Sequence, residues 1–474
     1  MIDGQIRYNE TVVRYFIVAA VAWGVVSMLI GVLIAAQLYW PALNFGSEYF
    51  NYGKLRPLHT NGVIYGFGTC MLMGTSLYIV QRTGKTGLLS DRLAYAVFYG
   101  WQLVLLAAVV TLPLGLTTSK EYAELEWPVD VLIAVTWVGY AVLFFGTLAQ
   151  RQVKHIFVAN WFFGAFIIVI AVIFVVNNLA IPVGLTKSYS VFAGTQDAMA
   201  QWWWGHNAVG FLLTAGFIGM NYYFVPKVAE RPIYSYRLSI LHFWSIVAFY
   251  TWLGSHHLIY STLPVWMQNI GIAMSIILWL PSWAGAYNSG RTILLNREKL
   301  RTDYILMFFM SAVVYYALAT FEGPLLSIRP INVISHNTDW TIGHVHSGAL
   351  GWVGMSVFAT LYYLVPKLWR ADLAFPGWIK YHFWLAHIGV AIYIVAMWVA
   401  GIGQGVLWMA RDDNGTLLYS FMDALRFTLP WYLVRAIGGA IYLLGVVLMT
   451  VNLAVTVRRA VASDKLAAGE QRYA

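Results

Sequence analysis

The sequence contains little charge. Only 10% of its 474 residues are Asp, Glu, Lys or Arg, against about 25% in an average soluble domain. Hydrophobic residues make up 60% of the chain. This composition excludes an ordinary soluble globular protein and predicts an all-α polytopic membrane protein. At about 20 apolar residues for each crossing, the chain has room for about 12 transmembrane helices and for no sizeable soluble domain.

Cysteine is almost absent, since Cys70 is the single cysteine of the chain. The chain therefore forms no intramolecular disulfide and carries no C-x-x-C-H motif that would attach a c-type haem. The net charge of +9 does not indicate nucleic acid, because Lys and Arg in a membrane protein mostly mark cytoplasmic loops. Aromatic residues, at 16%, exceed what interfacial belts require, which favours flat aromatic groups packed inside the bundle.

The apolar segments predict a single transmembrane catalytic domain over residues 1–474. Most Lys and Arg fall in alternate connecting loops, so we expect both termini on the cytoplasmic side and even-numbered helices that run from outside to inside. The helices expected are 15–38, 58–81, 92–114, 129–150, 156–180, 200–226, 238–260, 265–288, 303–325, 342–366, 378–405 and 430–457.

An internal repeat links the sixth and tenth of these helices. The segment from His206 to Lys227 aligns without a gap, at an offset of 140 residues, on the segment from His346 to Lys367, and both end in Tyr-Tyr-x-Val-Pro-Lys. The second helix repeats the pattern more weakly, with His59 followed by Tyr-x-Val-x-Arg. Inner-interface preferences explain the aromatic and basic ends, but they do not explain a histidine at a similar distance upstream each time.

Depth separates ten of the 11 histidines into two groups, and the eleventh, His336, lies in the outer loop before the tenth helix. At about 1.5 Å per residue from the nearest cytoplasmic basic residue, one group lies roughly 29–35 Å from the inner end. Ionisable groups at membrane depth are costly and usually mark function, and neutral imidazole is a common ligand of iron and copper. We interpret four others (His155, His242, His382 and His387) as structural or interfacial. The outer layer consists of His59, His206, His256, His257, His344 and His346.

Spacing within this layer suggests the kind of site. His344 and His346 leave one helix about 200° apart, so they suit two planar cofactors on opposite sides of that helix. His256 and His257 lie at a helix end, where the backbone can relax and let both rings face one ion. With His206 they form a three-imidazole site that suits copper, and also zinc or non-haem iron.

These residues carry a resemblance. The chain resembles the catalytic subunit of haem-copper oxidases, and most closely the cbb₃-type (C-type) cytochrome c oxidases, over nearly its whole length. The resemblance is carried by Trp203-Trp204-Gly205-His206-Asn207, by Tyr250 with Gly254-Ser255-His256-His257, and by Gly343-His344-Val345-His346-Ser347-Gly348. It implies a helical bundle with pseudo-threefold arrangement and two b-type haems. It also implies a low-spin haem held by His59 and His346, a high-spin haem held by His344, and one copper held by His206, His256 and His257.

Two departures from the commoner aa₃-type pattern bear on the reaction. Gly210 stands where that pattern has a tyrosine, and the family resembled here uses a tyrosine on the next helix, which Tyr250 matches. We therefore expect Tyr250, His206 and His344 to be the catalytic residues, and we expect the phenol of Tyr250 to supply an electron and a proton. The membrane glutamate of the second proton path is missing after Asn207, so we expect one path. Its candidates, on one face of the seventh helix, are Tyr236, Ser239 and Tyr250.

Further residues are expected around the cofactors. Metal-bound imidazoles normally donate their second N–H, and Glu322 is the candidate acceptor for His344. Haem propionates need cationic or N–H partners. The acidic outer loop 120–126 is expected mainly to be solvated, although the resemblance implies a calcium ion there with Glu121 as a ligand. The propionate candidates are Arg56, His336, Asn332 and Arg435.

The resemblance implies a terminal respiratory oxidase that reduces dioxygen to water and couples this to proton uptake and pumping. Without a c-haem motif or a soluble copper domain, the chain must receive electrons from partners. We expect membrane-anchored c-type cytochrome subunits, a soluble or membrane cytochrome c as donor, surrounding lipid, and a bacterial inner membrane.

Two alternatives stay open from the sequence. Nitric oxide reductase shares the fold and the six histidines but has non-haem iron where the oxidase has copper. Non-haem iron favours a glutamate ligand beside the three histidines, and the sequence around His206 contains no glutamate. A secondary transporter suits 12 spans and internal repeats, but it does not need six histidines at one depth.

Overall fold

The computed structural model describes residues 6–470, and within these residues 11 helical segments are long and apolar enough to cross a membrane. The prediction of an all-α membrane bundle of about 12 helices is confirmed. The elements, in chain order, are α1 (Glu10–Tyr39), η1 (Pro41–Asn44), α2 (Tyr52–Asn61), η2 (Gly62–Thr69), α3 (Cys70–Gly84), α4 (Asp91–Leu114), α5 (Trp127–Ala149), α6 (Val158–Asn177), β1 (Ala180–Gly184), β2 (Lys187–Ser190), α7 (Gly194–Ala208), η3 (Val209–Gly216), α8 (Phe217–Ala229), α9 (Tyr236–Tyr250), η4 (Leu253–Leu258), α10 (Val265–Leu294), α11 (Arg297–Thr302), α12 (Tyr304–Ser327), α13 (Arg329–Ser335), α14 (Asp339–His346), η5 (Ser347–Gly354), α15 (Met355–Trp369), α16 (Trp378–Met409) and α17 (Phe421–Glu470).

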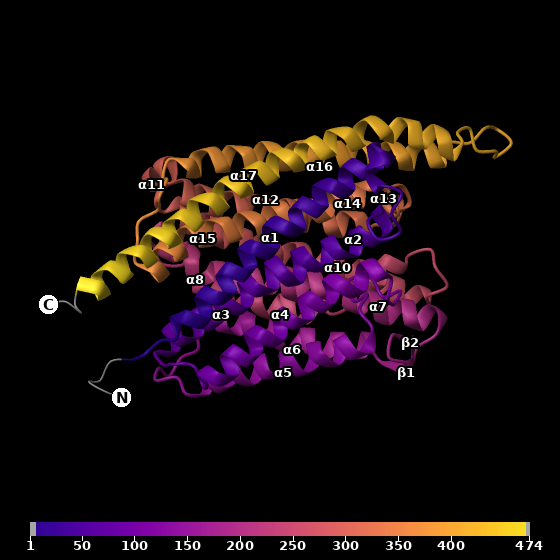
Figure 1. Ribbon diagram of the computed structural model, residues 1–474. Helices are drawn as coiled ribbons and strands as arrows, with labels where there is room; N and C mark the ends of the chain where they lie inside the picture. The colour runs from indigo at the N-terminus through magenta and orange to yellow at the C-terminus, as the bar shows by residue number, and fades with distance from the viewer. Residues whose placement is uncertain (1–5, 471–474) are drawn as a thin grey trace.

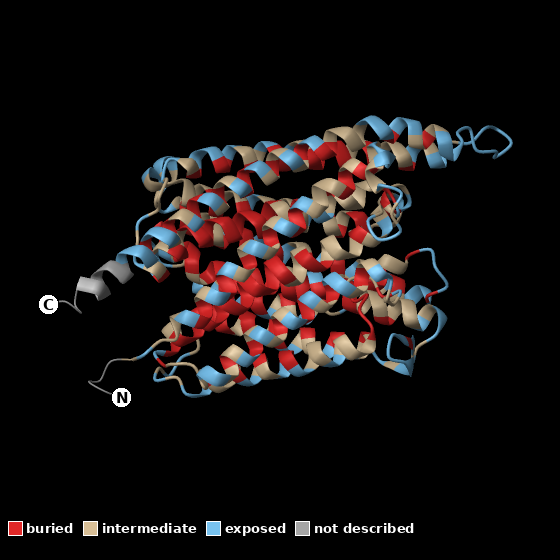
Figure 2. Cartoon of the chain, in the orientation of Figure 1, coloured by how far each residue is buried: buried red, intermediate tan, exposed pale blue. Residues whose placement is uncertain are grey.

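The long helices lie side by side as one bundle (Figure 1). The start of α1 and the end of α17 lie at the same end of this bundle, while β1, β2 and α13 lie at the opposite end. The two strands form an antiparallel hairpin, which the sequence did not predict. Buried residues concentrate in the middle of the bundle, and exposed residues cover its outer helices (Figure 2).

Three helices form the centre. Each begins with a short α-helical segment that ends in or beside a histidine, continues through a π-helical segment (η2, η3 or η5), and resumes as an α-helix. About four-fifths of the apolar window of each is buried, whereas most outer helices have a third to a half buried. π-helical segments inside α-helices are rare and occur frequently at functional sites. The three equivalent positions indicate that the bundle is built from repeated units.

The predicted helix 238–260 is not continuous. It forms α9 up to Tyr250 and then the 3₁₀ segment η4. The tighter 3₁₀ turn lets His256 and His257 leave the α-helical path, which a regular helix would not allow for two adjacent side chains aimed at one point. Other boundaries also differ: the second predicted helix begins at Tyr52 rather than at 58, and the last begins at Phe421 rather than at 430.

Candidate metal centre

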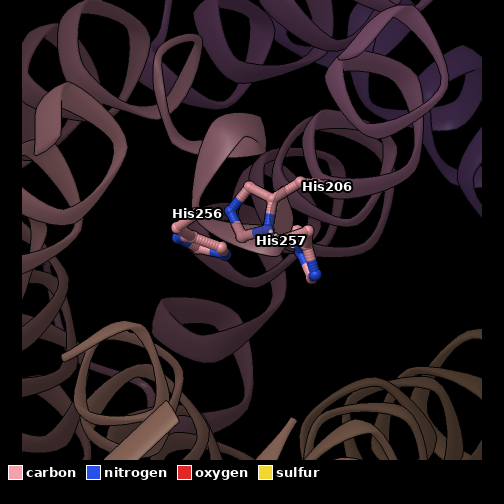
Figure 3. A group of neighbouring side chains, drawn as sticks. All are labelled: His206, His256 and His257. Atoms are coloured by element: carbon pink, nitrogen blue, oxygen red, sulfur yellow. Dashed lines mark hydrogen bonds between the residues drawn. The ribbon is translucent and has the colours of Figure 1, made fainter. Parts of the chain in front are cut away.

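Three histidine side chains, one from α7 and two from η4, converge inside the bundle. One ring nitrogen from each of His206, His256 and His257 lies within 4.8 Å of the others. The rings face one common point (Figure 3). Nδ1 of His206 lies 3.0 Å from Nε2 of His257. Three converging imidazoles in a largely buried site suit copper, zinc or non-haem iron.

Close packing fixes the loop that carries two of these rings. A Cβ at Gly254 would lie 2.6 Å from the carbonyl oxygen of Trp202, so only glycine permits this approach of η4 to α7. The indole of Trp202 stacks on the His257 ring, with centroids 3.9 Å apart and planes 9° apart. The position of His257 is therefore set by a rigid aromatic neighbour.

A serine determines which nitrogen of His256 faces the metal site. The buried hydroxyl of Ser275 donates to the carbonyl of Gly271 at 2.6 Å, and its oxygen lies 2.7 Å from Nδ1 of His256. Because the serine proton is already engaged, the serine oxygen accepts from Nδ1–H. The lone pair of Nε2 of His256 is thereby left free for a metal ion.

His206 is oriented differently. Its Nδ1 faces the cluster, while its Nε2 is buried without a hydrogen-bond partner among the described residues. The ring of Tyr250 lies against it, with centroids 5.3 Å apart and planes 26° apart. An orphaned buried nitrogen costs about 1–3 kcal/mol, so its presence beside a phenol indicates chemistry that the protein chain alone does not supply.

The two histidines of α14 project to different neighbours. Nδ1 of His344 lies 3.2 Å from Glu322 of α12, and the Glu322 carboxylate also accepts from Nε1 of Trp340 at 2.8 Å. The ring of His346 instead stacks on Tyr393 of α16, with centroids 4.4 Å apart. The two imidazoles therefore lie on opposite sides of the helix, as their spacing predicts.

Backbone carbonyls orient His59 and His346. Nδ1 of His59 lies 2.7 Å from the carbonyl of Ser27, and Nδ1 of His346 lies 2.9 Å from the carbonyl of Ile342. A carbonyl only accepts, so each Nδ1 carries its proton and each Nε2 keeps its lone pair. In His346 this lone pair accepts from the hydroxyl of Tyr393 at 3.3 Å. Gly31 provides the space for the His59 ring, since a Cβ there would lie 2.5 Å from Cε1. This is the tautomer that haem iron requires.

Comparison with known proteins agrees with this geometry. The family model described as "Cytochrome C and Quinol oxidase polypeptide I" matches residues 11–441. The chain is 56% identical to the cbb₃-type cytochrome c oxidase subunit CcoN1 of Stutzerimonas stutzeri, over 98% of both chains.

The chain belongs to this oxidase family.

Cytochrome c oxidase subunit 1 of Rhodobacter capsulatus is 50% identical, over 96% of this chain and 86% of its own. A solved haem-copper terminal oxidase dimer shares the fold, with a TM-score of 0.76 at 17% identity over 94% of this chain and 84% of its own. The resemblance seen in the sequence is thus confirmed, and the chain is a catalytic subunit of a terminal cytochrome c oxidase that holds haem and copper. The nitric oxide reductase and transporter alternatives are not favoured.

The residues expected near the propionates lie at the outer ends of the helices. Arg56 forms an ion pair with Glu121 at 2.5 Å, which joins a propionate candidate to the calcium candidate. Arg435 is buried 3.7 Å from Asp339. Asn332 is buried, with its Oδ1 unpaired among the described residues. His336 follows α13 directly, and burial lowers the pKa of its imidazole.

The structure differs from the predicted polar stripe on α9. The ring of Tyr236 is 40% exposed, and its hydroxyl accepts from the backbone N–H of Val158. It therefore lies at the surface instead of leading inward. Ser239, in contrast, is fully buried, and its hydroxyl oxygen accepts from Nδ2 of Asn288 at 3.0 Å. The helical-wheel angles placed Tyr236 and Ser239 on similar sides of the helix. They did not predict that the first residue of α6 would bond the hydroxyl of Tyr236.

A buried relay continues from Ser239, and it includes residues that sequence reasoning missed. The hydroxyl of Tyr222 lies 3.1 Å from Nδ1 of His242, and Ser239 and Asn288 lie near it. Nε2 of His242 lies 3.1 Å from the hydroxyl of Tyr316. His242 is therefore buried in a polar chain and does not lie at the membrane interface, which was one of the two positions expected of it. The repeat that contains Tyr222 was the signal that could have found it.

Proposed function

We propose that this chain reduces dioxygen to water at a high-spin haem and copper centre, with electrons from c-type cytochromes and with protons taken up and moved across the membrane. When bound, the haems and copper supply reversible binding of dioxygen and electron storage. The chain supplies their ligands, the proton route and a water-excluding apolar shell. The observation that carries this proposal is the convergence of His206, His256 and His257 beside Tyr250.

Each ligand assignment follows from the way in which the protein engages the two nitrogens of the ring. His59 and His346 would hold the low-spin haem, since both donate Nδ1–H to backbone carbonyls. His344 would hold the high-spin haem, and its hydrogen bond to Glu322 would raise its basicity. Copper would take Nδ1 of His206 with Nε2 of His256 and of His257. Both haems are proposed to be b-type, by family resemblance.

Tyr250 is proposed as the internal donor of one electron and one proton. Its ring lies against His206, whose Nε2 has no hydrogen-bond partner among the described residues. Thr214 of η3 lies near its hydroxyl. A phenol held in this position can replenish the reacting centre without waiting for an external electron.

Protons are proposed to enter at Ser239 and to pass through Tyr222, His242 and Tyr316 towards Tyr250. A neutral imidazole donates at one nitrogen and accepts at the other, so His242 between two phenols can pass a proton by reversing both hydrogen bonds. Tyr236 has no place in this route, because its hydroxyl is engaged at the surface.

Dioxygen is proposed to arrive through an apolar cavity between α4, α5, α6 and η3. Its lining includes Trp101, Phe174, Trp204 and Leu212, and two of these flank the segment from His206 to Gly210. An apolar lining suits an apolar substrate, and it admits little water to the site.

The outer loops are proposed to hold the propionates and a calcium ion. Arg56, Arg435, Asn332 and His336 offer cationic or N–H groups for propionate. Glu121 is paired with Arg56 in this structure, and its carboxylate would become a calcium ligand if that ion pair opened. The nearby Glu124 accepts from Nδ2 of Asn61 at 2.9 Å, and burial raises the pKa of its carboxyl.

The chain is proposed to work as one subunit of a complex in a bacterial inner membrane, with both termini cytoplasmic. Membrane-anchored c-type cytochrome subunits would bring electrons, because the chain has no motif for a covalently attached haem.

Metal content tests the proposed function. The purified complex should contain one copper for the two haems of this chain, and a reduced-minus-oxidised spectrum should contain bands of a low-spin and a high-spin b-type haem. A third iron without copper would support nitric oxide reduction instead. A colourless preparation would support a transporter.

A further inference from the structure

The inner ends of the three central helices repeat one pattern. Helices α3, α8 and α15 end at the end of the bundle where α1 begins (Figure 1), and α8 contacts both of the others. Near its end each helix has a tyrosine, a basic residue four positions later, and a residue with positive φ three positions after that. The three copies are Tyr78, Arg82 and Lys85; Tyr223, Lys227 and Glu230; and Tyr363, Lys367 and Arg370.

The three tyrosine rings of this pattern gather in one place. Tyr78 and Tyr223 meet edge to face, with ring centroids 6.2 Å apart. Phe224 stacks on Tyr78 at 6.1 Å and meets the ring of Tyr363 at 5.8 Å. Tyr363 also lies near both of the other phenols. The three phenols therefore form one cluster between the helices, which we call the inner phenol cluster.

Each basic side chain folds back onto the tyrosine of its own helix. A cation above a phenol ring is attracted by the negative face of the ring. The charged groups therefore stay at the inner phenol cluster instead of extending away from it. The distances from the charged group to the ring centroid are 3.5 Å for Arg82 on Tyr78, 5.6 Å for Lys227 on Tyr223 and 4.7 Å for Lys367 on Tyr363.

The cluster has more positive than negative charge. Two carboxylates lie near its phenols, and each already has a basic partner. Within the described part of the chain, Lys227 and Lys367 have no carboxylate partner. Two ammonium groups are thus left without a neutralising charge. The two existing ion pairs are Arg82–Glu10 and Lys299–Glu230, both at 2.5 Å.

The usual preferences of membrane proteins do not account for these two lysines. Basic residues at inner helix ends commonly reach lipid headgroups. Here, however, 78–83% of the apolar window of each central helix is buried, against 33–56% in the other spans. The inner phenol cluster therefore faces water on the inner side of the bundle and not lipid. The lysines are not needed as helix caps either, because the N–H of the residue with positive φ closes each helix.

The chemical groups of the cluster match a phosphate. A phosphate group carries nearly two negative charges at neutral pH, and its oxygens are strong hydrogen-bond acceptors. The two unpaired ammonium groups can balance this charge, and phenol hydroxyls can donate to the oxygens. The side chains of Tyr223 and Tyr363 are half-buried, so a ligand dissolved in water can reach them.

We propose that the inner phenol cluster, with Lys227 and Lys367, binds the phosphate group of a water-soluble anion, either inorganic phosphate or a phosphate ester. The occupant is a solute because the cluster lies inside the ring of lipid-facing helices. This inference goes beyond the proposed oxygen reaction and uses none of the residues assigned to it. A bound phosphate would join three helices that each continue from a segment with a ligand histidine, and it would stabilise the folded complex.

Stabilisation by phosphate measures this binding. The purified complex, with its haems and copper, is placed in phosphatidylcholine nanodiscs. Its thermal unfolding is followed by circular dichroism while inorganic phosphate replaces chloride at constant ionic strength. The variant Lys227→Gln with Lys367→Gln removes both unpaired charges. The matched control, Lys154→Gln with Lys380→Gln, removes two exposed lysines elsewhere.

In the wild type and in the control we expect the unfolding midpoint to rise and saturate, with half-saturation on the order of 1 mM phosphate. The Lys227 and Lys367 variant should need about ten times more phosphate or beyond, because two charge interactions are lost. Tyr223→Phe with Tyr363→Phe, which removes only the hydroxyls, should need about three times more. Oxygen consumption should stay within about twofold of the wild type in all variants, because none of these residues belongs to the oxygen site or the relay.

Three results would overturn the proposal. A midpoint that does not saturate with phosphate would show that no site exists. An equal response in the two lysine variants would show a general effect of charge. Nanodiscs that contain phosphatidylglycerol form the last arm, measured without phosphate. If this lipid alone reproduces the stabilisation that depends on Lys227 and Lys367, the site takes a lipid headgroup and not a solute.

Discussion

Gly210 lies directly against Tyr250. A Cβ at position 210 would lie 2.1 Å from Cε1 of the tyrosine ring, so the ring occupies the space that any larger residue at 210 would need. Gly210 is the position at which the aa₃-type pattern has its own tyrosine. Gly210 and Tyr250 therefore depend on each other: the phenol ring of α9 fits beside His206 because residue 210 on η3 has no side chain.

Gly210→Ala is therefore expected to displace the Tyr250 ring and to lower oxygen consumption about tenfold or more, because the phenol loses its position beside His206. Haem bands and copper content should stay near those of the wild type. Oxygen consumption is measured with the purified complex. Wild-type activity in this variant would contradict the role given to the contact.

Tyr250→Phe removes the hydroxyl and keeps the ring packing. We expect both haems and the copper to remain bound while oxygen reduction is nearly abolished, because the electron and proton of the phenol are lost. Steady-state turnover and metal analysis check this together. Turnover above about a tenth of the wild type would exclude the tyrosine as a required donor.

His256→Ala is expected to lose copper and activity but to keep the low-spin haem bands. Ser275→Ala should have a milder effect of the same kind, since it leaves Nδ1 of His256 without its acceptor and loosens the ring. The copper-to-haem ratio after dialysis against a chelator measures copper retention in both variants. Ser275→Thr, which keeps the hydroxyl, is the control. Full copper retention in the serine-to-alanine variant would contradict the orienting role of Ser275.

Glu322→Gln is expected to raise the reduction potential of the high-spin haem. A carboxylate at Nδ1 of His344 makes the imidazole more basic and stabilises ferric iron, and an amide does so less. The shift should be on the order of 60 mV, which is about 1.4 kcal/mol for one electron. Spectroelectrochemical titration measures it, and a potential that falls or stays constant would refute the hydrogen bond's proposed effect.

Ser239→Val and Ser239→Thr differ only in a methyl or hydroxyl group and so isolate the hydrogen bond to Asn288. The valine variant should slow oxygen consumption about tenfold, and the threonine variant should recover most of that loss. Proton uptake during a single turnover, followed with a pH-sensitive dye, is the second measurement. Equal rates in the two variants would exclude Ser239 from the proton route.

The sequence predicted the membrane bundle and the layer of histidines because both follow from local properties: apolar length and depth from a basic helix end. It predicted the opposite directions of His344 and His346 from helical spacing alone. It did not predict which neighbours meet a given helix face. Tyr236 was therefore predicted in the proton path, although its hydroxyl accepts from α6 at the surface. His242 was interpreted as structural or interfacial, and the sequence did not predict that α8 and α12 would bury it between two phenols.

Hydrogen-bond direction was equally beyond the sequence. That Ser275 orients His256, and that Arg56 pairs with Glu121, depend on contacts between distant segments. The repeat was visible as Tyr-Tyr-x-Val-Pro-Lys, but the sequence did not predict that Tyr222 would meet His242 of α9.

Anomalous X-ray scattering at the copper and iron edges, from crystals of the purified complex, tests the central claim most directly. The account predicts one copper peak among Nδ1 of His206 and Nε2 of His256 and His257, one iron peak beside His344, and a second iron between His59 and His346. An iron peak in place of the copper, or the absence of any metal among the three rings, would contradict it.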